Sequence, residues 1–247
     1  MIATPPPGGA SGRRRTLVAE IFETPDAALA GIEDGATVMV GGFVSAGSPT
    51  NLIYALKRRG TRGLTAIANN IGFGDRLDEL CEHGQIAHMI ASFAIRASAS
   101  KWSRFEEQYH RGEVTLELVP QGTLVERIRA GGAGLGGVLT RTGLDTVVEE
   151  GKRRIEVEGV DYLLETPLRG DVALIQAHRA DRLGNLVYRA SGRNFNPLMA
   201  TAADLVIAEV SEIVETGELD PDTVGTPAVY VDRIVRCDPI EVRLEGM

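Results

Sequence analysis

Residues 34–49, which read DGATVMVGGFVSAGSP, decide the fold predicted for this chain. Thr37–Val40 is a short apolar run between turn residues, which is typical of a buried strand. The loop at residues 41–47 contains three glycines, which let the backbone adopt positive φ or approach a ligand closely. Ser48 suits an N-cap and Pro49 a first helical position. The stretch predicts strand, glycine loop and helix, the unit with which open α/β sheets bind ligands at the carboxyl ends of their strands.

Two known ligand motifs come close to this loop and do not fit it. The loop reads G-G-F-x-x-x-G rather than G-x-G-x-x-G, and no Lys-Ser or Lys-Thr pair follows to make a P-loop. Ser45 lies in F-V-S-A-G, where Phe43 replaces the first glycine of a nucleophile elbow. The pattern therefore favours an anion- or cofactor-binding loop over a hydrolase serine, with a tight βα turn that binds no ligand as the alternative.

Amide side chains follow two further predicted strands. Asn69 and Asn70 come directly after the apolar run at residues 64–68. Gln121 lies between the alternating strand at residues 114–119 and the start of a predicted helix. Because the carboxyl ends of parallel strands meet at one edge of a sheet, we expect these amides to lie beside the glycine loop.

Local patterns predict several more elements. Trp102, Phe105 and Tyr109 form an aromatic core stripe on one predicted helix, and a second helix begins with a capping box at residues 123–126 and ends at Arg129. Residues 131–137, with five glycines, are predicted to be irregular, and residues 155–164 to form a hairpin with its turn at Glu158 and Gly159. A last helix is predicted to have Asn196 as its cap and Pro197 at its first position. The alternation of strands and helices predicts an α/β fold with a single open, mostly parallel twisted sheet and helices on both faces. We expect a flexible tail at residues 1–15 and one domain at residues 16–247.

Composition excludes some classes of protein. At 247 residues and 43% hydrophobic content, the chain can bury a full core. A net charge of −8 argues against nucleic acid as a partner. Cys81 and Cys237 fit neither a disulfide framework nor a metal site, and the four histidines lack ligand spacing, so we predict no metal. Without a signal sequence or a long apolar run, the chain is predicted to be cytoplasmic, with no membrane contact.

Six short stretches of the sequence match the pattern of one known family. They are the D-G-x-x-(apolar)-G-G-F-x-x-x-G-x-P stretch, Asn69-Asn70, V-P-Q-G-T at residues 119–123, R-A-G-G-A-G at residues 129–134, R-N-F-N-P at residues 193–197 and Y-V-D-R at residues 230–233. In these stretches, which occur in the family's order and cover the chain from about Thr24 to Val235, the chain resembles the class I (family I) CoA-transferases. The G-G-A-G-L-G-G run, with L-L-E at residues 163–165 and A-H-R at residues 177–179, is most similar to the A (alpha) subunit of acetate/acetoacetate (3-oxoacid) CoA-transferases.

This resemblance implies a ping-pong enzyme that moves CoA between an acyl-CoA and a carboxylic acid through a glutamyl-CoA thioester. The family's nucleophilic glutamate lies in Ser-Glu-Asn-Gly, and no Glu-Asn-Gly occurs in this sequence. We therefore expect a separate beta subunit to supply it, in an α₂β₂ or larger assembly. CoA would be a substrate, with no tightly bound cofactor. The implied catalytic residues are Gln121, Asn69 and Asn70, and the implied CoA-binding loop consists of Gly41, Gly42, Phe43, Val44, Ser45, Ala46 and Gly47.

Other functions stay open at this point. The A (alpha) subunit of a 3-oxoadipate CoA-transferase shares nearly all these motifs. A sugar-phosphate isomerase of related architecture would need a basic phosphate pocket, which the sequence does not indicate. An inert regulatory subunit would have no need of amides at the strand ends. Arg141 stands where the family usually has proline, and residues 94–103 also depart from its pattern, so no specific acid substrate is predicted.

Overall fold

The computed structural model describes residues 18–96 and 101–240, and its centre is a nine-stranded sheet. The strands are β1 (Glu20–Phe22), β2 (Thr37–Val40), β3 (Leu64–Asn70), β4 (Ile86–Phe93), β5 (Thr115–Leu118), β9 (Gly170–Asp181), β10 (Leu186–Val187), β11 (Ala203–Val214) and β12 (Arg233–Arg236). The order is β1-β12-β11-β9-β2-β3-β4-β5, with parallel neighbours throughout, and β10 pairs antiparallel with β9. The prediction of an open, mostly parallel α/β sheet is confirmed.

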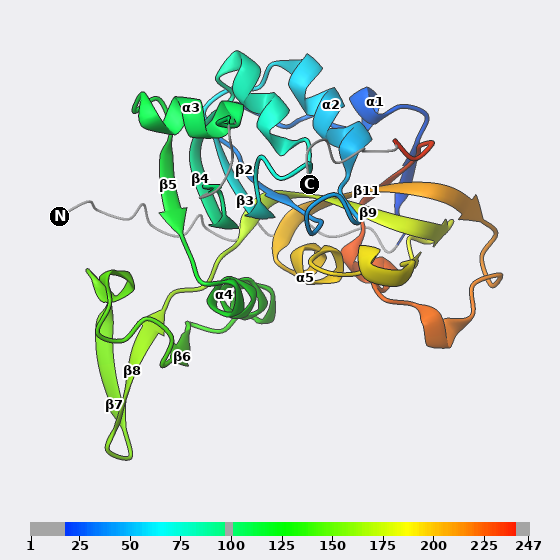
Figure 1. Cartoon of the computed structure of the whole chain (residues 1–247). Coiled ribbons are helices and arrows are strands. Elements are labelled where there is room, and N and C mark those ends of the chain that lie inside the picture. Colours follow the sequence, from blue (N-terminus) through cyan, green and yellow to red (C-terminus); the bar gives the residue numbers. More distant parts are fainter. Residues whose placement is uncertain (1–17, 97–100, 241–247) are drawn as a thin grey trace.

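Helices cover both faces of this sheet, as predicted. The α-helices are α1 (Pro25–Ala28), α2 (Thr50–Arg59), α3 (Arg104–His110), α4 (Gln121–Ala133) and α5 (Asn196–Thr201), and the 3₁₀ turns are η1 (Leu77–His83), η2 (Val147–Glu149), η3 (Ala190–Gly192), η4 (Pro221–Thr223) and η5 (Ala228–Tyr230). Figure 1 shows α1, α2 and α3 on one face and α4 and α5 on the other.

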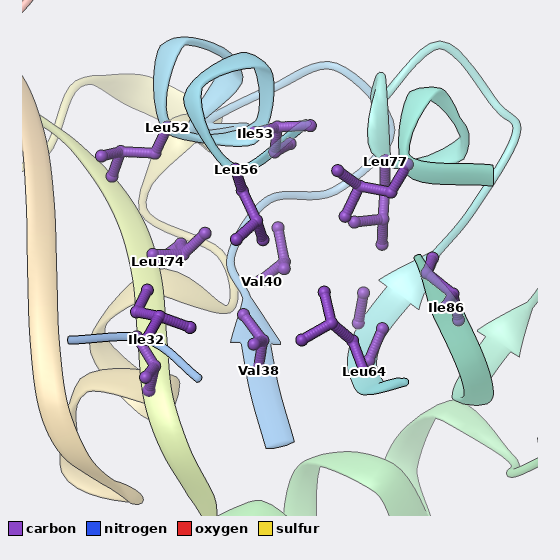
Figure 2. Packing of buried hydrophobic residues seen from close by; sticks show 14 of the residues in the cluster. Ile32, Val38, Val40, Leu52, Ile53, Leu56, Leu64, Leu77, Ile86 and Leu174 are labelled. Carbon is purple, nitrogen blue, oxygen red and sulfur yellow. The ribbon is translucent and has the colours of Figure 1, made fainter. Parts of the chain in front are cut away.

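The strands divide their apolar side chains between two cores because successive residues point to opposite faces. In β2, Val38 and Val40 belong to the core under α2 and η1, whereas Met39 belongs to the core under α4 and α5. Figure 2 shows Leu52 and Leu56 of α2 packed over this part of the sheet. Strands that are buried on both faces explain the continuous apolar runs in the sequence.

A second, antiparallel sheet extends from the main body, and we call it the arm. It consists of β6 (Val138–Thr140), β7 (Arg153–Val157) and β8 (Val160–Glu165) in the order β6-β8-β7. The predicted hairpin turn is confirmed, since Glu158 and Gly159 adopt φ of 50° and 78°, as a two-residue turn requires. Figure 1 shows the arm beyond α4, pointing away from the main sheet. The sequence patterns did not predict that this hairpin belongs to a sheet of its own.

A buried charge network fixes the arm to α4. Lys152 Nζ lies 2.6 Å from Glu165 Oε1, and the Glu165 side chain is only 2% exposed. Arg127, inside α4, donates through Nε to the carbonyl of Thr166 at 2.8 Å. The start of β7, the end of β8 and the middle of α4 are therefore held together by polar contacts.

Two predicted helix starts are wrong by one or two residues. Helix α2 begins at Thr50 with Pro49 at its N-cap, and the Ser48 hydroxyl donates instead to the carbonyl of Asp75 at 2.9 Å. Helix α4 begins at Gln121, before the predicted capping box, and continues through Gly131 and Ala133, so the glycine-rich segment is partly helical. A side chain at Gly131 would overlap the carbonyl of Leu168, so the glycine is needed for close packing rather than for irregular backbone.

Two further local predictions are also wrong. The aromatic stripe holds for Phe105, which is fully buried, but Trp102 is 56% exposed and Tyr109 is 40% exposed. Trp102 instead stacks on His110 with ring centroids 4.1 Å apart. The N-cap of α5 is Phe195, and Asn196 forms tertiary hydrogen bonds described below.

The tail predicted at residues 1–15 lies outside the described residues, and the division into a tail and one domain stays a prediction. Of the helices in the described ranges, none combines the length and the apolar character that crossing a membrane requires.

Candidate functional site

The glycine loop after β2 ends in a tight, strained turn. Phe43 and Ala46 exchange two backbone hydrogen bonds of 3.0 Å. Between them, Val44 has φ of 53°, a region that β-branched residues rarely adopt. This conformation directs the Val44 N–H to Asn70 Oδ1 at 2.8 Å. Strain of this kind costs about 1–3 kcal/mol and is typical of ligand-binding turns, which makes the loop a candidate binding element.

Three amide side chains form a connected row beside the loop, and we call Gln121, Asn69 and Asn70 the amide row. Gln121 Nε2 donates to Asn69 Oδ1 at 2.7 Å. Asn69 Nδ2 then donates to Asn70 Oδ1 at 2.8 Å. The two asparagines end β3, and Gln121 is the first residue of α4, shortly after β5. The strand ends therefore bring the predicted residues together, and their roles in binding and catalysis stay predictions.

The buried end of the row is a carboxylate that the sequence analysis missed. Asn70 Nδ2 donates to Asp75 Oδ2 at 2.7 Å, and the backbone N–H groups of Phe73 and Leu77 also donate to Asp75. Burial raises the pKa of the Asp75 carboxyl to about 6, although these three hydrogen bonds act in the opposite direction. An aspartate between glycine and arginine in a short connection reads as an ordinary turn residue, so no sequence signal marked it.

A small cavity lies between the loop and the amide row. Its volume is about 10 Å³, enough for roughly one water molecule. Its lining includes Gly41, Gly42, Val44, Asn69, Asn70 and Asp75. The glycine loop and the two asparagines of the amide row thus border one small cavity.

Two asparagines from the R-N-F-N-P stretch hold the other side of the loop. Asn196 is fully buried, and its Nδ2 donates to the carbonyls of Gly47 at 3.0 Å and Gly192 at 2.9 Å. Its Oδ1 accepts from the backbone N–H of Gln176 in β9 at 3.0 Å. Asn194 Nδ2 donates to the carbonyl of Ala46 at 2.9 Å. These contacts connect the loop to β9 and make both asparagines positioning residues.

The glutamates near the family motifs are engaged elsewhere. Glu126 pairs with Arg129, Glu165 with Lys152, and Glu212 with Arg179. Glu209 of β11 accepts from the N–H of Leu52 at 2.9 Å, so it caps the N-terminus of α2. Burial raises the pKa of Glu209 to about 7. All four therefore have capping or salt-bridge roles in this fold.

The arrangement suits a reaction in which negative charge develops on an oxygen. The amide row offers neutral N–H donors, which stabilise an oxyanion without trapping an anionic substrate. Phe43, in the turn of the loop, is 42% exposed, so the loop also presents an apolar side chain. Among the described residues, no group of three His, Cys, Asp or Glu side chains could hold a metal ion.

Comparison with known proteins shows consistent similarity to one family. The family model described as Coenzyme A transferase matches residues 22–236. The alpha subunit of the acetate CoA-transferase of Escherichia coli is 51% identical over 203 residues, which cover 82% of this chain and 90% of that protein. The A (alpha) subunit of a succinyl-CoA:3-ketoacid coenzyme A transferase of Xanthomonas campestris is 49% identical, covering 92% and 93%. The corresponding subunit of a 3-oxoadipate CoA-transferase of Acinetobacter baylyi is 48% identical, covering 84% and 90%.

Solved structures share the fold. The glutaconate coenzyme A-transferase of Acidaminococcus fermentans has a TM-score of 0.79 at 20% identity, covering 89% of this chain and 76% of that one. An acyl-CoA transferase of Escherichia coli, in a thioester complex with CoA, has a TM-score of 0.76 at 23% identity. That match covers 93% of this chain but only 49%, about half, of the other chain.

Proposed function

This chain belongs to the coenzyme A transferase family, and from that premise we propose that it is the A (alpha) subunit of an enzyme that moves CoA between a short-chain acyl-CoA and a carboxylic acid. The observation that carries the proposal is the amide row beside the strained glycine loop. In this arrangement Gln121, Asn69 and Asn70 would donate to substrate oxygens, and residues 41–47 would contact CoA.

The proposed chemistry is an exchange through an enzyme carboxylate. A glutamate attacks the carbonyl of the acyl-CoA, which forms a mixed anhydride and releases the CoA thiolate. The thiolate then attacks the glutamyl carbonyl, which forms a glutamyl-CoA thioester and frees the first carboxylate. The acceptor acid reverses these steps. Each attack places negative charge on an oxygen, and the Gln121 amide would stabilise that charge.

A separate beta subunit would supply the glutamate. The four motif-adjacent glutamates of this chain are paired or act as caps, and the curated relatives are themselves named as subunits. An assembly of α₂β₂ or larger would complete the site. The 3-oxoadipate relative, at 48% identity, gives that substrate no advantage over the acetate relative at 51%.

The test is to purify the chain alone and together with its beta subunit, and to measure CoA transfer from acetoacetyl-CoA to acetate. We expect turnover only from the assembly, and mass spectrometry should find a CoA thioester on the beta subunit. A panel of acceptor acids that includes 3-oxoadipate then assigns the substrate. Turnover by the isolated chain would refute the shared active site.

The variant Gln121→Ala tests the donor directly. Removing one oxyanion donor typically lowers kcat by about 10²–10³, and we expect a loss of that size in the assembly. Circular dichroism and gel filtration should show a folded, assembled variant. Near-normal turnover in Gln121→Ala would leave the side chain with a structural role only.

A further inference from the structure

The buried end of the amide row is a carboxylate whose role as an acceptor is fixed by the backbone around it. Above its pKa the Asp75 carboxylate only accepts hydrogen bonds. The N–H groups of Phe73 and Leu77 approach it at 3.0 and 2.8 Å, and Asp75 is only 5% exposed. Because backbone N–H groups can only donate, these contacts identify Asp75 as the acceptor at the buried end of the row.

That acceptor determines the direction of every amide after it. Asn70 must turn its nitrogen toward Asp75, which leaves its oxygen for the Val44 N–H and for Asn69 Nδ2. Asn69 then turns its oxygen toward Gln121, and Gln121 must meet it with Nε2. The backbone N–H of Val44 donates to this same Asn70 oxygen at 2.8 Å, in agreement with the orientation that Asp75 requires. The row therefore has one direction, from Gln121 as donor to Asp75 as acceptor.

We propose that Asp75 is a positioning residue that fixes the direction of the amide row, so that Gln121 presents an N–H group to the substrate oxygen. This inference rests on the proposed function, since it names the group that orients the donor. An amide nitrogen carries two hydrogens, and Asn69 uses one of those on Gln121, so the second remains for a substrate. If the row were reversed, a carbonyl oxygen would occupy the same place and would repel an oxyanion.

The same geometry makes the row sensitive to pH. Three donors point at Asp75, so a protonated carboxyl would bring a fourth hydrogen among them. Burial raises the pKa of Asp75 from 3.8 to about 6, and the negative charge of Asp78 contributes to this rise. The neighbouring Cys81 has its own pKa raised to about 12 by burial, so it does not titrate in this range. We expect the amides of the row to keep their orientation at pH 7.5 and to lose it below pH 6.

The first test needs no enzymatic activity. In the ¹⁵N-labelled full chain at pH 7.5, Asp75→Asn should shift the side-chain amide signals of Asn70, Asn69 and Gln121 together, because the substituted side chain has one acceptor oxygen for three donors. It should also accelerate amide hydrogen exchange at Val44 by at least about 10-fold, since the hydrogen bond from Val44 to Asn70 loses its support. A change confined to Asn70 would overturn the proposal.

Two controls separate positioning from folding. Asp78→Asn removes a nearby carboxylate, whose pKa burial also raises, and should leave the three amide signals in place. If Asp75→Asn does not fold, the wild-type chain decides the question: the three amide signals should shift together between pH 7.5 and pH 5. Signals that shift independently of one another would overturn the proposal.

The second test uses the assembled enzyme. Asp75→Asn should lower kcat by about 10- to 100-fold, which is no more than the fall in kcat expected when a whole donor is removed. KM for the acyl-CoA should change less than about twofold. The acidic limb of the kcat profile near pH 6 should disappear in Asp75→Asn and persist in Asp78→Asn. A normal kcat with the limb intact would overturn the proposal. An inactive wild-type assembly would instead refute the proposed function, and the amide signals would still decide the role of Asp75.

Discussion

Gly41→Ala tests whether the glycine loop is held by Asn196. Gly41 follows β2, and a methyl group at this position would overlap Asn196 Oδ1. Asn196 is fully buried in a close-packed interior, so a small shift of its side chain cannot relieve the overlap. The side chain must therefore give up its present position. Its contacts to Gln176, Gly47 and Gly192 would then break together.

The magnitude follows from the groups left without partners. The Gln176 N–H would lose its acceptor, and leaving a buried donor unpaired costs about 1–3 kcal/mol. The two hydrogen bonds from Asn196 Nδ2 contribute about 0.5–1.5 kcal/mol each. We therefore expect Gly41→Ala to lower the free energy of unfolding by roughly 2–6 kcal/mol. Urea unfolding followed by circular dichroism measures this directly.

A double-mutant cycle isolates the clash. In the Asn196→Ala background the overlapping oxygen is absent, so Gly41→Ala should cost less than about 1 kcal/mol there, and the two substitutions should be strongly non-additive. Gly122→Ala is the matched control, because that glycine lies in α4 with open space around it and alanine favours a helix by about 0.5–1 kcal/mol. Equal costs of Gly41→Ala in both backgrounds would refute the role given to Asn196.

Two further predictions concern stability. Glu209 has a pKa of about 7 in the fold against 4.5 ordinarily, so the native state keeps the proton between these values and stability falls as pH rises through that window, by about 3 kcal/mol. In Glu209→Gln this part of the pH dependence should vanish when urea unfolding is compared at pH 4.5 and pH 8, and an unchanged pH dependence would contradict the assignment. Phe105→Ala should cost about 3–5 kcal/mol because the ring is fully buried, whereas Tyr109→Ala, from a side chain that is 40% exposed, should cost far less; similar losses would show that the two rings are equally buried in solution.

The convergence of the site was predictable because it depends on strand ends. Each of the three amides lies at the end of a strand or just after it, and parallel strands of one sheet end at the same edge. Gln121 and Asn69 therefore meet although 52 positions separate them. The direction of the row was not predictable. It depends on Asp75, whose role arises from burial and from two backbone donors that only the folded loop brings together.

The predicted N-caps of two helices were wrong for a related reason. Ser48 and Asn196 have the local pattern of N-caps, but each side chain bonds to a distant segment, the carbonyl of Asp75 in one case and the backbone of β9 in the other. The capping of α2 comes from Glu209, 157 positions from Leu52. Tertiary contacts of this range override local preferences, and a local pattern carries no information about them.

The hydrogen bonds that hold the glycine loop in place have a consequence for binding. The tip is closed by the hydrogen bonds between Phe43 and Ala46, and Asn194 and Asn196 fasten its far side. A ligand that arrives therefore meets main chain that is already ordered, and association loses little conformational entropy in the protein. If the loop binds CoA as proposed, we expect the rate of complex formation to be governed by diffusion and by the removal of water from its amides, without a slow closure step.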